Sequence, residues 1–200
     1  NFCFREIDDS IVDSLYEESW SPSETVLDKM KSASIKKPSD HFFYNYMISI
    51  GEGSIGKFNQ NQTFTAFRRY YRSKRMGVPL EQWVKDGLPK AVTRWKYSLQ
   101  PIGSFYVGNR KIDISTATSR ALSRIRIASE GPPIPLVMML LHRTSLPKKD
   151  PKYFSTSELE KCAITLEGVL YKTLMNGDSL TNFRALIIKS ILSWEKSCLT

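Results

Sequence analysis

Cysteine and histidine, which metal sites and nucleophilic catalysis often require, are scarce in this 200-residue chain. The three cysteines, Cys3, Cys162 and Cys198, are too few and too far apart for a disulfide framework, so we interpret them as reduced thiols. Neither His41 nor His142 has a cysteine or carboxylate partner at metal-ligand spacing, which excludes a zinc centre or an HNH-type nuclease. The sequence therefore predicts no metal site, no cofactor and structural roles for both histidines.

Motifs of common catalytic sites are also missing. The segment GEGSIGKF, residues 51–58, has the glycines and the lysine of a phosphate-binding loop, but Phe58 stands where Ser or Thr would hold magnesium. There is no Gly-x-Ser-x-Gly nucleophile motif. We therefore predict no catalytic residue in this chain; a metal-free enzyme that uses the acidic N-terminal segment is the alternative. The spacing of that segment's carboxylates instead favours one solvated helix face: Asp8, Asp9, Asp13, Glu17 and Glu18.

Long apolar runs are absent, since none approaches the roughly 20 residues that span a bilayer. The first ten residues, NFCFREIDDS, lack the basic and apolar regions of a signal peptide. We therefore expect a cytoplasmic protein with no membrane contact. Because the sequence does not begin with Met, we also expect it to be part of a longer protein.

Positive charge is what the chain has in excess, with a formal net charge of +9 and a pI near 9.5. The charge is uneven: residues 1–40 hold five Lys and Arg against nine carboxylates, a net of −4. Residues 57–96 hold ten Lys and Arg against two carboxylates, a net of +8. This distribution indicates an anionic partner for the middle of the chain.

The most basic stretch is AFRRYYRSKRMG, residues 66–77. On a helix over 61–75, Phe64, Phe67 and Tyr71 would form a core face, and a stripe of arginines would lie about a quarter-turn away. Guanidinium groups bind phosphate oxygens bidentately, and a tyrosine can donate to phosphate or stack on a base. We therefore predict that these residues and the basic residues of the next helix contact nucleic acid: Arg68, Arg69, Tyr70, Arg72, Lys74, Arg75, Lys90, Arg94 and Lys96.

Two other interpretations of the basic stretch are open. Basic side chains commonly cover the aromatic rim of a core with their methylene stems, so the stretch fits the solvated face of an ordinary helix. It also fits an ion-paired contact with the acidic N-terminal segment.

Apolar periodicity predicts a mainly α-helical domain. We expect helices over 9–19, from Ser21 (with Ser21 as N-cap), from Ser39, over 61–75 and over 79–99, the last kinked or split by Pro89. Residues 102–114 give a small β-hairpin around Gly108-Asn109. A helix containing Ala117 and Ala121 then precedes a short, nearly all-apolar helix in GPPIPLVMMLLHR, which we expect at the centre of the fold.

The C-terminal part predicts an antiparallel helix hairpin. Ser155 with Glu158 and Ser157 with Glu160 are overlapping capping boxes, and Asn176-Gly177 ends the first helix. The second helix carries the apolar stripe Leu180, Phe183, Ile187, Ile191 and Trp194. We divide the chain into a helical domain over 1–145, a Pro- and Lys-rich linker over 146–153, and a hairpin over 154–200 packed on the same core.

Three parts of the sequence together resemble a known family. They are SDHFFYNYMIS at 39–49 with FTAFRRYY at 64–71, PLVMMLLHR at 135–143, and LEKCAITLEGVLYKTLMNGDSLTNFRALIIKSI at 159–191. In order and spacing they resemble the helical region of GmrSD-type, modification-dependent (type IV) restriction proteins with a ParB/sulfiredoxin-like N-terminal domain. Tyr171-Lys172 replaces the Arg-Arg of the family pattern. The family's Asp-Gly-Gln-Gln-Arg nucleotide-site motif and its His-containing nuclease motif are absent.

The resemblance implies a helical portion of a prokaryotic anti-phage defence protein, with DNA rather than RNA as partner and other domains of a longer parent around it. Such a parent is expected to be an NTP-dependent nuclease, but no catalytic residue carries over to this chain. The alternative is a viral or phage helical assembly protein that binds RNA or an acidic protein partner.

Overall fold

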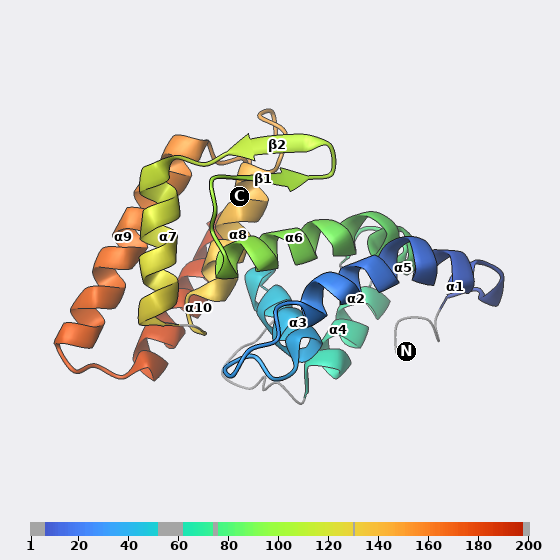
Figure 1. Cartoon of the computed structure of the whole chain (residues 1–200), viewed down its shortest axis with the longest axis horizontal. Helices are drawn as coiled ribbons and strands as arrows, with labels where there is room; N and C mark the ends of the chain where they lie inside the picture. The colour runs from blue at the N-terminus through green and yellow to red at the C-terminus, as the bar shows by residue number, and fades with distance from the viewer. Residues whose placement is uncertain (1–6, 52–61, 74–75, 130, 198–200) are drawn as a thin grey trace.

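The structure, a computed structural model, describes residues 7–51, 62–73, 76–129 and 131–197. These residues form a mainly α-helical protein with one two-stranded antiparallel sheet, which confirms the predicted fold class (Figure 1). In chain order, with η for a π-helical turn, the elements are α1 (Asp9–Leu15), η2 (Tyr16–Trp20), α2 (Ser21–Asp28), α3 (Pro38–Ser49), α4 (Thr63–Arg72), α5 (Leu80–Gln82), η4 (Trp83–Gly87), α6 (Leu88–Leu99), β1 (Ser104–Val107), β2 (Arg110–Asp113), α7 (Thr116–Ala128), α8 (Ile134–Thr144), α9 (Thr156–Met175) and α10 (Leu180–Ser197).

The first two helical predictions are corrected by a continuous helix. Ser21 does not act as an N-cap: its φ of −57° and ψ of −44° are helical, and α1, η2 and α2 follow one another without a break. The N–H of Ser21 bonds to the C=O of Tyr16, five residues back, so Pro22 follows a widened turn. Because proline has no N–H and its ring crowds the preceding turn, the π-helical turn gives it room inside the helix.

Pro89 is accommodated in the same way. The N–H of Leu88 bonds to the C=O of Trp83, again five residues back, and α5, η4 and α6 form one helical stretch. The kink predicted at Pro89 is therefore a π-helical turn placed before the proline. The two widened helices pack on each other, η2 against η4 and α2 against α6.

Aromatic rings of α3 hold the first of two hydrophobic cores. The Phe43 ring centroid lies 5.3 Å from that of Phe67 in α4, 6.3 Å from that of Trp83 in η4 and 6.2 Å from that of Trp20 in η2. The Trp83 Nε1–H donates to the Tyr46 hydroxyl at 2.9 Å. The helical spacing of α3 thus aims its aromatic side chains at three other helical elements.

The second core surrounds α8, whose residues 134–141 are all buried, as predicted for a central apolar helix. Ile134 and Met138 belong to the first core, whereas Val137 and Leu141 belong to the second, so α8 joins the two. The second core also takes buried side chains from the hairpin, α7, α9 and α10.

The β-hairpin is confirmed. Phe105 of β1 pairs with Ile112 of β2, both are buried, and Gly108 occupies the turn with a φ of 59°. That left-handed conformation is one that glycine adopts without steric cost.

The C-terminal helix pair is confirmed as well (Figure 1). Ser155 and Glu158 form the predicted capping box, and Gly177 ends α9 with a φ of 71°. Leu180, expected on the apolar stripe, is 36% exposed instead. After residues 146–153 the chain returns to the end of α8, where the Phe154 N–H donates to the Arg143 C=O at 3.2 Å. The division of the chain at this segment stays a prediction.

Substitution of Gly87 tests the packing of the π-helical turn η4. An alanine there would place its Cβ 2.6 Å from Trp83 Cδ1, and Trp83 is held by its core packing and its hydrogen bond to Tyr46. We expect Gly87→Ala to lower the free energy of unfolding by about 1–3 kcal/mol, measured by urea denaturation.

Gly168 is the matched control. It is an exposed position inside α9 where an added Cβ meets nothing within 4 Å. Gly168→Ala should raise the free energy of unfolding by about 0.5–1 kcal/mol, because alanine loses less entropy in a helix. Equal stability of Gly87→Ala and the wild type would contradict the packing described for η4.

Candidate nucleic-acid interface

Helix α4 separates a core face from a basic face, as the sequence predicts. Phe67 is fully buried, and its ring centroid lies 4.9 Å from that of Trp83. Phe64 and Tyr71 are partly buried and pack against the same core. These three residues fix the rotation of α4 about its axis and therefore decide which side chains face outward.

The outward side carries three arginines. Arg68, Arg69 and Arg72 are exposed, together with Thr65, at the i, i+3, i+4 and i+7 positions of one helix face. We call the three arginines the basic face of α4. The guanidinium of Arg69 makes no ion pair or hydrogen bond with another described residue, so it is open to a partner. Lys74 and Arg75 lie outside the described residues.

Tyr70 lies between the first core and the surface of α4. The sequence left it as the tyrosine available to a partner, but it is half-buried and packs against the first core beside Tyr71. Five aromatic and aliphatic positions of α4 thus serve the core: Phe64, Ala66, Phe67, Tyr70 and Tyr71. The basic face of α4 is therefore made of arginines alone.

The predicted residues of α6 divide between surface and interior. Lys90 and Lys96 are exposed, but Arg94 is only 9% exposed and lies among the buried residues of the helix. The i, i+4 spacing of Lys90 and Arg94 does not place both on an exposed face, because α6 is covered by α2, α3 and α8. Arg94 is therefore removed from the predicted contact set.

Burial decides the electrostatics of Arg94. Burial lowers the pKa of its guanidinium to about 10, while the nearby Tyr46 favours the charged form. Burial also raises the pKa of Tyr46. The guanidinium of Arg94 has no hydrogen bond and no carboxylate partner among the residues the structure describes, so burial of its charge costs free energy.

The remaining lysines do not extend the basic face of α4 into one surface. The Lys90 Cε lies 3.8 Å from the position that a Cβ at Gly108 would take, which places Lys90 beside the turn of the β-hairpin. In Figure 1 the hairpin lies above α6, whereas α4 lies below it, beside α3. The predicted site is therefore two separate groups, of which α4 holds the denser one.

His41 and the acidic N-terminal segment, the other residues considered for catalysis, do not form a catalytic group among the described residues. The Trp95 Nε1–H donates to His41 Nδ1 at 3.2 Å, and the Asn45 Nδ2 donates to the His41 C=O at 2.7 Å. The acidic side chains of residues 8–18 are exposed, which confirms a solvated face. Within the described ranges, no group of three His, Cys, Asp or Glu residues could hold a metal ion, and none of the helices is long and apolar enough to cross a membrane. Most of GEGSIGKF lies outside those ranges.

Comparison of the chain with protein-family models, curated proteins and solved structures finds no match.

The structure adds one cationic residue, Arg184, that the sequence analysis did not predict as a binding residue. Arg184 of α10 follows the buried Phe183, and its guanidinium lies 5.0 Å from the centroid of the Tyr44 ring in α3. The two residues are 140 positions apart by their numbers, so no local pattern links them. The only signal was an arginine at the border of an apolar helix stripe.

The burial of Arg94 gives a testable outcome. Methionine has a similar length and no charge, so Arg94→Met should leave the free energy of unfolding unchanged or raise it by up to about 2 kcal/mol in urea denaturation. Lys96→Met, on the exposed side of the same helix, should change it by no more than about 0.5 kcal/mol. A clear loss of stability in Arg94→Met alone would show that the buried guanidinium makes a contact the fold requires.

Proposed function

We propose that this chain is a non-catalytic helical part of a prokaryotic anti-phage restriction protein, and that it binds DNA through the basic face of α4. The observation that carries the proposal is the outward display of Arg68, Arg69 and Arg72 on one face of a helix whose other side is anchored in the core. Such a face presents several guanidinium groups at a fixed spacing to a row of phosphates.

The physics of the helix surface supports an anionic partner. Like charges three and four residues apart repel each other by a few tenths of a kcal/mol per pair, and a bound polyanion relieves this cost. The surrounding segment, residues 57–96, carries a net of +8, so the long-range field also attracts a polyanion. Contacts of this kind position a nucleic acid without reading its sequence.

The restriction-protein part of the proposal rests on the resemblance of the three sequence segments. The structure places these segments in α3 and α4, in α8, and in the α9–α10 hairpin. These are the elements that build both cores, so the segments belong to the framework of the fold. Sequencing the complete reading frame around this chain tests this part of the proposal. A nucleotide-site motif before the chain or a nuclease motif after it would support a restriction protein.

DNA binding is tested by charge reversal on α4. The triple variant Arg68→Glu, Arg69→Glu and Arg72→Glu should weaken DNA binding in a mobility-shift assay by at least about tenfold at low salt. The slope of log K against log salt concentration should become shallower by about 2–3, because three phosphate contacts are lost. Thermal melting of the variant shows whether the fold is kept.

A matched variant separates the local face from the net charge. Lys161→Glu, Lys172→Glu and Lys189→Glu change the charge by the same amount at exposed positions of α9 and α10. This control should bind DNA nearly as the wild type does. Equal losses in both triple variants would show that only net charge matters, and no retardation of duplex or single-stranded DNA by the wild type at about 50 mM salt would refute DNA binding altogether.

A second candidate function is favoured by exposed apolar residues of α9. Ile164 is 50% exposed, Tyr171 39% and Met175 85%, and the i, i+7, i+11 spacing puts them on one face with Gly168 between. Exposed apolar patches mark interaction sites, so this face supports a viral or phage helical assembly protein whose basic residues meet RNA or an acidic protein.

Size-exclusion chromatography before and after nuclease treatment distinguishes the two functions. An assembly protein should give a defined oligomer that survives nuclease and is lost in Ile164→Glu with Tyr171→Glu. A monomer whose 260 nm excess disappears on nuclease treatment would favour nucleic-acid binding and contradict the assembly function.

A further inference from the structure

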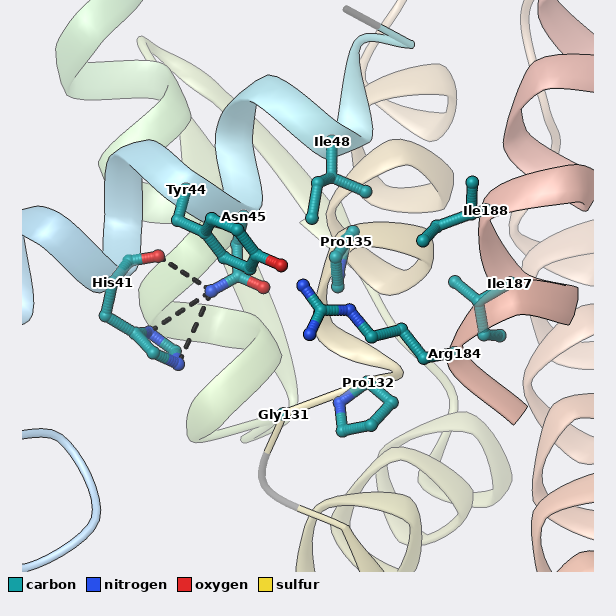
Figure 2. Close-up of a pocket in the computed structure, with 10 residues that line it drawn as sticks. All are labelled: His41, Tyr44, Asn45, Ile48, Gly131, Pro132, Pro135, Arg184, Ile187 and Ile188. Atoms are coloured by element: carbon teal, nitrogen blue, oxygen red, sulfur yellow. Dashed lines mark hydrogen bonds between the residues drawn. The ribbon is translucent and has the colours of Figure 1, made fainter. Parts of the chain in front are cut away.

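A cavity of about 160 Å³ lies where α3, α10 and the residues that lead into α8 meet (Figure 2). Ile48, Pro135 and Ile187 give it an apolar wall. Asn45 and Arg184 give it polar groups, and no described residue of its lining is a carboxylate. It lies apart from the basic face of α4 and is independent of the proposed function.

Arg184 is the charged group of this cavity. Its guanidinium carbon lies 5.0 Å from the Tyr44 ring centroid, so the ring holds the cation by a cation–π contact. The side chain is half-buried, and this burial lowers its pKa. The guanidinium of Arg184 has no carboxylate partner and no hydrogen bond among the described residues. A guanidinium stacked on a ring keeps its N–H groups free at its edges, where an oxyanion can bind them bidentately.

Asn45 supplies a hydrogen-bond acceptor beside the cation. It is 3% exposed, and its Nδ2 donates to the His41 C=O at 2.7 Å. A carbonyl only accepts, so this bond fixes the amide nitrogen toward His41 and turns the amide oxygen toward the side where Arg184 enters (Figure 2). No described residue donates to this oxygen. An acceptor that faces a cavity and has no protein donor favours a ligand that brings one.

We propose that this cavity binds a small organic oxyanion, a carboxylate or a phosphate monoester, with its charged head on Arg184 and its apolar body against Ile48, Pro135 and Ile187. An apolar cavity of about 150 Å³ accommodates benzene, so a body of about one six-membered ring fits. A protonated oxygen or an amide N–H close to the charged head would satisfy the Asn45 oxygen. A cationic ligand is disfavoured because it would meet the guanidinium with no carboxylate among the described lining residues to balance it.

The proposal is tested by calorimetric titration of the full chain with benzoate, phenyl phosphate, inorganic phosphate and neutral benzamide. We expect saturable binding of benzoate or phenyl phosphate with a Kd of about 1 mM or tighter, and at least about tenfold weaker binding of benzamide and of inorganic phosphate. No saturable binding of either organic anion would overturn the proposal, and so would equal binding of benzamide, because the charge would then play no part. Inorganic phosphate binding as tightly as phenyl phosphate would exclude the role given to the apolar wall.

Variants of α10 locate the binding. Arg184→Gln should weaken binding of the organic anion by at least about tenfold, whereas Lys189→Gln, which removes the same charge from an exposed position of that helix, should leave it unchanged. Arg184→Lys keeps the charge without the bidentate guanidinium and should bind the organic anion with an intermediate Kd. This variant tests the assignment if thermal melting shows that Arg184→Gln is unfolded. Unchanged binding in folded Arg184→Gln, or in Arg184→Lys where only that variant folds, would place the anion elsewhere and overturn the assignment.

Discussion

The contact on which the first core depends is the packing of Trp83 against α3, completed by its hydrogen bond to Tyr46 at 2.9 Å. The indole lies in a π-helical turn, so the widened turn and the aromatic core hold each other in place. The Phe67 ring packs on the same indole and thereby sets the rotation of α4. The outward direction of the arginines on α4 is thus a consequence of an aromatic contact on its opposite side.

The two prolines inside helices show how this arrangement tolerates residues that usually end a helix. Pro22 and Pro89 each follow a residue whose N–H bonds five positions back, so neither proline ring meets a regular α-helical turn. The two π-helical turns pack on each other, which places both irregularities in one interface. The helices continue on both sides of each widened turn.

Three arginines of this protein lie in different environments, and their chemistry differs accordingly. Arg69 is in water, where a phosphate can reach it. Arg94 is enclosed by α6 and its neighbours, where burial of its charge costs free energy. Arg184 is stacked on Tyr44 at the edge of a cavity, where it is partly desolvated yet reachable by a small anion. A count of basic residues cannot separate these cases, because burial decides how strongly each charge interacts.

Local patterns in the sequence determined the helices, the hairpin turn at Gly108, the capping box at Ser155 and the core face of α4, because each depends on residues within a few positions of one another. The prediction of an N-cap at Ser21 was wrong, because the same residues that signal a cap before proline also occur after a π-helical turn. The burial of Arg94 and the meeting of Arg184 with Tyr44 were decided only by the tertiary structure. Both result from packing between helices that are distant in the chain. This packing sets the dielectric surroundings of each charge, and the spacing of neighbouring residues in the sequence does not reveal it.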